Sequence, residues 1–138
     1  MTRLAIISDV HADLHALRDA LAQAERMECA AIVCCGDLVD YGAYPDETIE
    51  LLEQRAIPCI RGNHDRWAVM GDATPRERGT ACLSPATMRY LAELPTTWNT
   101  VIDGTRVAAR HGTPGSDMDG IDPDRISIED ARRWLDRN

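Results

Sequence analysis

Residues 1–65 alternate between short apolar runs and helical segments, and this alternation limits the possible folds more than any other feature of the chain. The runs Arg3–Ile7, Ala30–Cys35 and Ile57–Ile60 are almost continuously apolar, which is typical of strands covered on both faces. Between them, Asp13–Arg26 has leucines at helical spacing, and residues 45–55 begin with a proline, as helices often do. Strands that alternate with helices predict a βαβαβ unit with a parallel sheet and right-handed crossovers.

The second half of the chain has weaker periodicity. Residues 67–80 contain two glycines and a proline, and we interpret them as a loop or an irregular insertion. Ser84 and Pro85 resemble an N-cap and a first helical residue, and predict a helix to about Leu94. The runs TWNTVI and RVAAR predict a later β-hairpin, and Ser127 begins a short final helix. The 138 residues are therefore expected to form one α/β domain, residues 1–138.

Charge and cysteine content exclude several classes of function. The net charge is −8, whereas binding to nucleic acid or to a membrane surface requires clustered Lys and Arg. A phosphate-bearing substrate is not excluded, because bound divalent cations can dominate the charge of a site. The five cysteines form no Cys-x-x-Cys pair, and we expect reduced thiols. The N-terminal apolar run is too short for a signal peptide or a membrane span, so we expect a cytoplasmic protein.

Polar side chains gather where the predicted strands end. Asp9 and His11 follow the first strand, and Asp37 follows the second. The third strand leads into Gly62–Asp65, which reads GNHD, and the hairpin leads to His111. In an open parallel sheet, ligands bind just beyond the carboxyl ends of the strands. These side chains are therefore candidates for one shared site.

The electrostatics of such a cluster favour a metal ion. Two carboxylates ~4 Å apart repel each other by about 4 kcal/mol at an effective dielectric constant of about 20. A divalent cation between them removes that cost. A mixture of oxygen and imidazole ligands suits Mn, Fe, Zn or Ni better than Ca. A carboxylate shared through Asp37 would hold two ions roughly 3.5–4 Å apart, the spacing used in phosphoester hydrolysis.

The strings DVH, GDLVDYGAYP, GNHD and HGTP occur in this order between Leu4 and about Gly115. In order and spacing they resemble the calcineurin-like metallophosphoesterases, especially their small bacterial and archaeal phosphodiesterase branch. The resemblance implies a layered α/β fold, a small phosphoester substrate and two divalent transition-metal ions, with manganese favoured. It also implies hydrolysis of phosphomonoesters or phosphodiesters by a metal-bound hydroxide at a dinuclear centre.

The resemblance further implies roles for individual residues. His64 would protonate the leaving oxygen or stabilise charge on the phosphoryl group. Asp65 has no ligand role in the family scheme, and we expect it to orient a histidine. Five side chains are implied to hold the metals: Asp9 and His11 for the first ion, Asn63 and His111 for the second, and Asp37 for both.

The chain departs from the family pattern at two points. The family pattern ends with a Gly-His-x-His string that completes both metal sites, and this sequence contains none. Each ion would then keep three protein ligands and bind more weakly. We therefore expect a C-terminally shortened fold, either as a natural short form or as a fragment. Its exposed sheet edge or apolar patch is expected to lead to homo-oligomers. The alternative function is a catalytically impaired relative that binds metal or a partner. Asp40 replaces a common glycine, but it is not a proposed ligand and does not put the chemistry in doubt.

Overall fold

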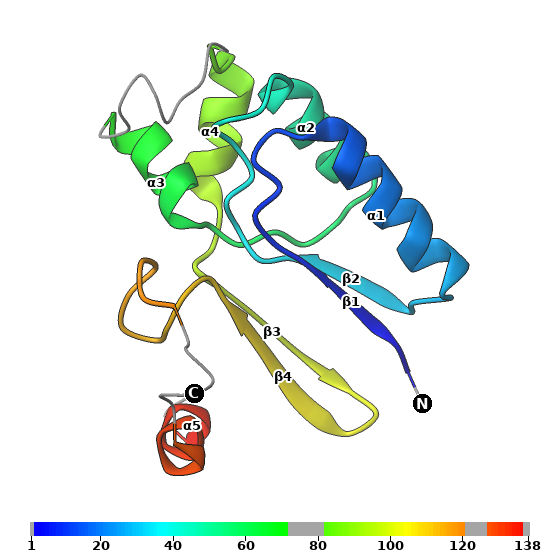
Figure 1. Cartoon of the computed structure of the whole chain (residues 1–138), viewed down its shortest axis with the longest axis vertical. Helices are drawn as coiled ribbons and strands as arrows, with labels where there is room; N and C mark the ends of the chain where they lie inside the picture. Colours follow the sequence, from blue (N-terminus) through cyan, green and yellow to red (C-terminus); the bar gives the residue numbers. More distant parts are fainter. Residues whose placement is uncertain (1, 72–81, 121–126, 137–138) are drawn as a thin grey trace.

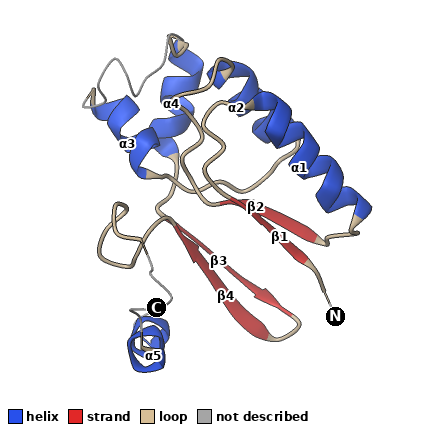
Figure 2. Cartoon of the chain, viewed as in Figure 1, coloured by secondary structure: helices blue, strands red, loops and turns tan. Residues whose placement is uncertain are grey.

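The structure is a helical layer, a parallel strand pair and an antiparallel hairpin (Figure 1). It is a computed structural model that describes residues 2–71, 82–120 and 127–136. Figure 2 shows the helices that precede the hairpin gathered on one side of the strand pair, and the hairpin and the final helix on the other. The elements in chain order are β1 (Leu4–Ile7), α1 (Leu14–Arg26), β2 (Ala31–Cys34), α2 (Pro45–Gln54), α3 (Asn63–Met70), α4 (Pro85–Glu93), β3 (Thr97–Ile102), β4 (Thr105–Arg110) and α5 (Ile128–Asp136).

The core is divided between the two faces of the strand pair. β1 and β2 pair in parallel, in register from Leu4 opposite Ala31 to Ile7 opposite Cys34. Because successive side chains of a strand alternate in direction, each face has its own apolar cluster. On the helical side, α1 and α2 pack against β2 and the run after α2, and the buried residues there include Leu17, Leu21, Cys34, Ile49, Leu52 and Cys59. The hairpin side buries Val33, Cys35, Ile60 and Ala109, with Leu4 and Trp98 packed against them.

Two strand predictions need correction. The run Ile57–Ile60 was predicted to be a full third strand, but it forms a single parallel bridge between Cys34 and Cys59. Pro58 has no N–H to extend the ladder, although its carbonyl accepts a hydrogen bond from Cys34 N–H at 2.8 Å. The strand β1 was predicted to be covered on both faces, yet Ile6 is 64% exposed.

The third helix was not predicted. Residues 67–80 were interpreted as a loop, but α3 begins at Asn63 and continues to Met70. It ends at Gly71, whose φ of 77° is the left-handed conformation typical of a helix C-terminus. The GNHD string is therefore the first turn of a helix as well as the end of an extended run. Residues 72–81 lie outside the described part of the chain.

The predicted helix starts at Ser84 and Ser127 and the predicted hairpin are confirmed. Ser84 caps α4 through its side chain, which accepts from Thr87 N–H, and Ser127 Oγ accepts from Asp130 N–H before α5. The hairpin turns at Asp103 and Gly104, both with positive φ, as a two-residue type I′ turn requires. The five cysteines are free thiols. In the described ranges, no helix combines the length and apolar content that a bilayer crossing needs.

Asp46, in the first turn of α2, connects that helix to α4. Its Oδ1 accepts hydrogen bonds from Ser84 N–H at 3.0 Å and from the Thr87 hydroxyl at 2.6 Å. Burial alone would raise the pKa of Asp46, but the hydrogen bonds from Thr87 and Ser84 outweigh burial and lower it. A carboxylate with a lowered folded pKa contributes stability at neutral pH that is lost as the pH falls through that pKa.

We therefore expect Asp46→Asn to lower the free energy of unfolding at pH 7 by about 1 kcal/mol. The variant should also lose less stability than the wild type as the pH falls below about 5, since it has no charge to neutralise at that position. Urea denaturation at pH 7 and at pH 4 measures both effects. Glu47→Gln, which removes an exposed charge from the same turn, is the matched control. Equal losses in the two variants would contradict this role of Asp46.

Candidate metal centre

Asp9 and His11 leave the end of β1 in an unusual backbone conformation. Their φ angles are 56° and 49°, in the left-handed region that L residues seldom adopt. The backbone is held there by hydrogen bonds to the loop after β2: Asp9 N–H donates to Gly36 O at 3.0 Å, and His11 N–H donates to Asp37 O at 2.9 Å. Such strained positions cluster at functional sites. The bonds place both side chains beside Asp37.

Two glycines allow the second and third strand ends to approach each other. A Cβ on Gly62 would lie 2.1 Å from Asp37 Oδ1, and a Cβ on Gly36 would lie 2.6 Å from Gly62 N. No larger residue fits at either position without moving the backbone. The close approach lets His64 N–H, in the first turn of α3, donate to Asp37 Oδ1 at 2.9 Å. Asp37 is thereby fixed at the positive end of a helix dipole.

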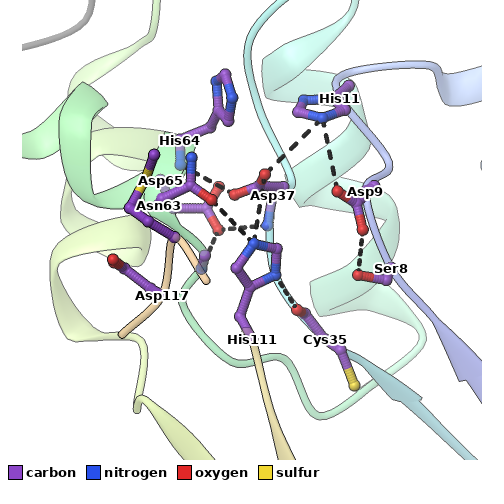
Figure 3. Close-up of polar contacts among 12 residues, drawn as sticks. Ser8, Asp9, His11, Cys35, Asp37, Asn63, His64, Asp65, His111 and Asp117 are labelled. Carbon is purple, nitrogen blue, oxygen red and sulfur yellow. Dashed lines mark hydrogen bonds and ion pairs between the residues drawn. The ribbon is translucent and has the colours of Figure 1, made fainter. Parts of the chain in front are cut away.

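Asp37 lies at the centre of the site, between two imidazoles (Figure 3). Its side chain is only 4% exposed, and its Oδ2 is 3.8 Å from His11 Nε2 and 3.5 Å from His111 Nε2. These separations are too long for good hydrogen bonds. They match atoms bound to a common ion, which lie roughly 3–4 Å apart when each metal–ligand bond is about 2.0–2.2 Å. On the other side, Asp9 Oδ1 lies 3.9 Å from His11 Nε2.

The two imidazoles are oriented as metal ligands need to be. His11 Nδ1 lies 3.1 Å from Val39 O, and His111 Nδ1 lies 2.7 Å from Cys35 O. A carbonyl oxygen only accepts, so each Nδ1 carries the hydrogen and each Nε2 presents a lone pair. This arrangement fixes the tautomer and the direction of a ligating histidine. The donor set therefore fits a transition-metal ion.

Asn63 is the first residue of α3, is 8% exposed, and faces His111. Its Oδ1 lies 3.0 Å from His111 Nε2. With the proton of His111 on Nδ1, both of these atoms present lone pairs to each other. A cation bound between them would satisfy both, which supports Asn63 and His111 as ligands of one ion.

All six sequence-predicted site residues come together around Asp37. Two sets of possible ligand atoms each lie within 4.8 Å of one another, and Asp37 belongs to both. The sets are His11, Asp37 and His64, and Asp9, Asp37 and His111. His64 was predicted to face the substrate, and Asp9 was predicted to share an ion with His11. The assignment of ligands to individual ions stays a prediction.

Asp40 was not proposed as a metal ligand, and the structure shows that it contacts His64 instead. Its Oδ2 lies 3.0 Å from His64 Nδ1, and both residues are buried, at 4% and 7% exposure. A carboxylate in this position fixes the imidazole ring and leaves Nε2 as its other functional atom. The sequence offered one signal for this contact: Asp40, three positions after Asp37, stands where the family often has glycine.

Asp65 does not orient a histidine, contrary to the prediction. Its side chain is fully buried and accepts hydrogen bonds from the backbone N–H groups of Asp37, Leu38 and Gly62, at 3.0, 2.8 and 2.9 Å. Burial raises the pKa of Asp65 to about 6, although these hydrogen bonds favour the charged form. Asp65 therefore joins the loop after β2 to the start of α3, and so positions Asp37 relative to Asn63.

Aromatic side chains form one rim of the site. The ring of Tyr41, which is 56% exposed, lies 4.8 Å from that of His11 and 5.0 Å from that of His64. Trp67, on the next turn of α3, lies 4.7 Å from His64.

The family model for the calcineurin-like phosphoesterases matches residues 2–137. The chain belongs to this family. It is 31% identical over 121 residues to an uncharacterised protein, MJ0912, of Methanocaldococcus jannaschii, a match covering 80% of this chain and 49% of the relative. The chain thus spans about half the length of this curated relative.

Solved structures of similar fold agree with this placement. A metallophosphoesterase from Sphaerobacter thermophilus is 30% identical with a TM-score of 0.71, and the match covers 95% of this chain and 56% of that one. The hypothetical protein PH1004 from Pyrococcus horikoshii has a TM-score of 0.78 at 19% identity, covering 99% of this chain and 65% of that one. At that identity, PH1004 supports the calcineurin-like fold alone.

Proposed function

We propose that this chain hydrolyses small phosphoesters, monoesters or diesters, at a centre of two divalent metal ions. One observation carries the proposal: the Nε2 atoms of His11 and His111 converge on the carboxylate of Asp37, at 3.8 and 3.5 Å. Each ring is locked in this direction by a backbone carbonyl. The proposed metal ligands are Asp9, His11, Asp37, Asn63 and His111.

The donor chemistry narrows the choice of ion. Carboxylate, amide oxygen and imidazole ligands fit Mn, Fe, Zn or Ni, and we favour Mn. Such ions, when bound, supply Lewis acidity toward the phosphoryl oxygens and lower the pKa of water. The protein supplies a rigid frame for them, because Asp37 is fixed through its backbone by Asp65 and through Oδ1 by His64 N–H.

His64 is proposed to donate a proton to the leaving oxygen. The hydrogen bond between its Nδ1 and Asp40 holds the ring so that Nε2 is the atom that can transfer a proton. Asp40 is a positioning residue, because it acts through His64. Of these two side chains, only that of His64 needs to reach the substrate.

Metal removal tests the proposal. Protein treated with a chelator should not hydrolyse p-nitrophenyl phosphate or bis-p-nitrophenyl phosphate, and activity should return as Mn²⁺ is added back. Calorimetric titration should give two ions per chain. The control is the same chelator-treated protein in magnesium-free buffer, with no metal ion added back. Two tightly bound ions with no turnover on either compound would instead support the alternative, a metal-binding relative that lacks catalysis.

The cellular setting and assembly stay predictions within this proposal. We propose a cytoplasmic protein in which residues 1–138 form one domain and which forms homo-oligomers. The exposed Ile6 on β1 supports self-association, since β1 pairs only with β2 among the described strands.

A further inference from the structure

A polar cavity of about 250 Å³ lies beside the candidate metal centre. Arg61, which immediately precedes Gly62, lines it together with Arg110 at the end of β4. Thr96 and the loop of residues 113–117 complete the wall. His111 lines the cavity as well, and its Nε2 is 3.5 Å from Asp37 Oδ2. The cavity and the metal centre therefore share one side chain.

The lining is suited to an anion. Two arginines line one small cavity in a chain whose net charge is −8. Asp117, the carboxylate in this lining, receives two hydrogen bonds from Arg66, at 2.7 and 3.0 Å, so Arg66 balances its charge. The hydrogen bonds to Arg66 also lower the pKa of Asp117. Guanidinium groups bind phosphate through paired N–H donors, and the hydroxyls of Thr96 and Ser116 add further donors.

The neighbouring metal centre limits which anion the cavity would hold. In the proposed centre the metal ions would hold the scissile phosphate, so a second negative group of the substrate needs cations of its own. The cavity supplies them next to His111. Its volume is several times the ~30 Å³ that one water occupies in the liquid, so a phosphate group fits.

We propose that this cavity binds a second phosphate group of the substrate, while the scissile phosphate lies at the metal centre. The inference rests on the proposed function, and it names the substrate class: molecules with at least two phosphate groups rather than cyclic nucleotides or simple phosphomonoesters. Arg61 and Arg110 are the residues that select them.

Binding of inorganic phosphate to the chelator-treated protein tests the cavity without turnover. Phosphate should shift the amide NMR signals of Thr96, Gly115 and Ser116. Arg61→Gln should weaken this binding about 10-fold, the loss expected for one charged hydrogen-bonding partner. The backbone of Arg61, whose N–H donates to Pro95 O at 2.7 Å, is unaffected by the substitution. Arg89→Gln, on the exposed side of α4, is the control. Unshifted signals, or equal affinity in the Arg61 variant, would overturn the proposal.

The matched nucleotides AMP and ADP test the substrate class with the Mn²⁺-loaded protein. ADP should be hydrolysed with a kcat/KM at least about 10-fold higher than that of AMP. Arg61→Gln and Arg110→Gln should each remove most of this preference by raising the KM for ADP. Equal kcat/KM values in the wild type would overturn the proposed class. Phosphate binding in the cavity without turnover of either nucleotide would instead refute the proposed hydrolase function and leave the anion site supported.

Discussion

Asp37→Asn is expected to abolish phosphoester hydrolysis and the binding of the second metal ion. Asp37 belongs to both groups of candidate ligand atoms, so in the proposed centre its charge would serve both ions. Losing an outer partner of a ligand typically costs 10- to 100-fold in affinity or activity, and a shared ligand should cost no less. We therefore expect kcat/KM for bis-p-nitrophenyl phosphate to fall by about 1,000-fold, and metal content to fall below two ions per chain.

Asparagine is the informative substitution because it keeps the local structure. Its Oδ1 can still accept the hydrogen bond that His64 N–H donates to Asp37 Oδ1 at 2.9 Å. Asp19→Asn, at an exposed position of α1, removes the same charge elsewhere and should change neither quantity. Metal content is measured by elemental analysis after gel filtration, and folding by circular dichroism. Two retained ions with full activity would refute the bridging role.

Local signals predicted the elements whose ends they mark. Pro45 begins α2, Ser84 caps α4, and the Asp103–Gly104 pair turns the hairpin, because each acts through its own backbone conformation. The start of α3 carries no such signal, since Gly62 at its N-cap has no side chain to accept a hydrogen bond. Asp65, three residues later, accepts from Gly62 N–H instead. The helix was therefore concealed within a string that the sequence presents as a strand end.

The candidate site likewise has residues that the sequence predicted and residues that it did not. Strand ends accounted for His11 and Asp37, because the parallel strands β1 and β2 end at the same edge of a sheet. His111 follows β4 of the antiparallel hairpin, so the order of the motifs, and not strand direction, predicted that it joins them. The supporting carboxylates could not be found by that route. Asp40 reaches His64 across 24 positions, and Asp65 reaches Asp37 across 28. Those contacts depend on the left-handed backbone of the loop after β2, where Asp37 and Asp40 have φ angles of 54° and 73°.

The role of His64 gives the second large prediction. As a proton donor it should contribute about 100- to 10,000-fold to kcat, so His64→Asn should lower kcat by that factor while both metal ions remain bound. The loss should depend on the leaving group. Nitrophenolate leaves without much protonation, whereas a ribosyl or alkyl oxygen needs the proton, so the variant should lose more activity on AMP than on p-nitrophenyl phosphate. Asp40→Asn, which only releases the His64 ring, should reproduce this pattern with a smaller loss.

The leaving-group dependence and the metal content of the His64 variant together separate proton donation from metal binding, the other role that the geometry allows for His64. His64 shares a set of possible ligand atoms with His11 and Asp37, so a ligand role predicts a lost ion and similar losses on every substrate. His15→Asn is the control, because His15 lies on the exposed face of α1 with its ring against Tyr44. Since Asp40 holds Nδ1 at 3.0 Å, a bound ion would have to compete for Nε2, the same atom that a proton donor uses. A leaving-group effect with two ions retained therefore assigns Nε2 to the substrate.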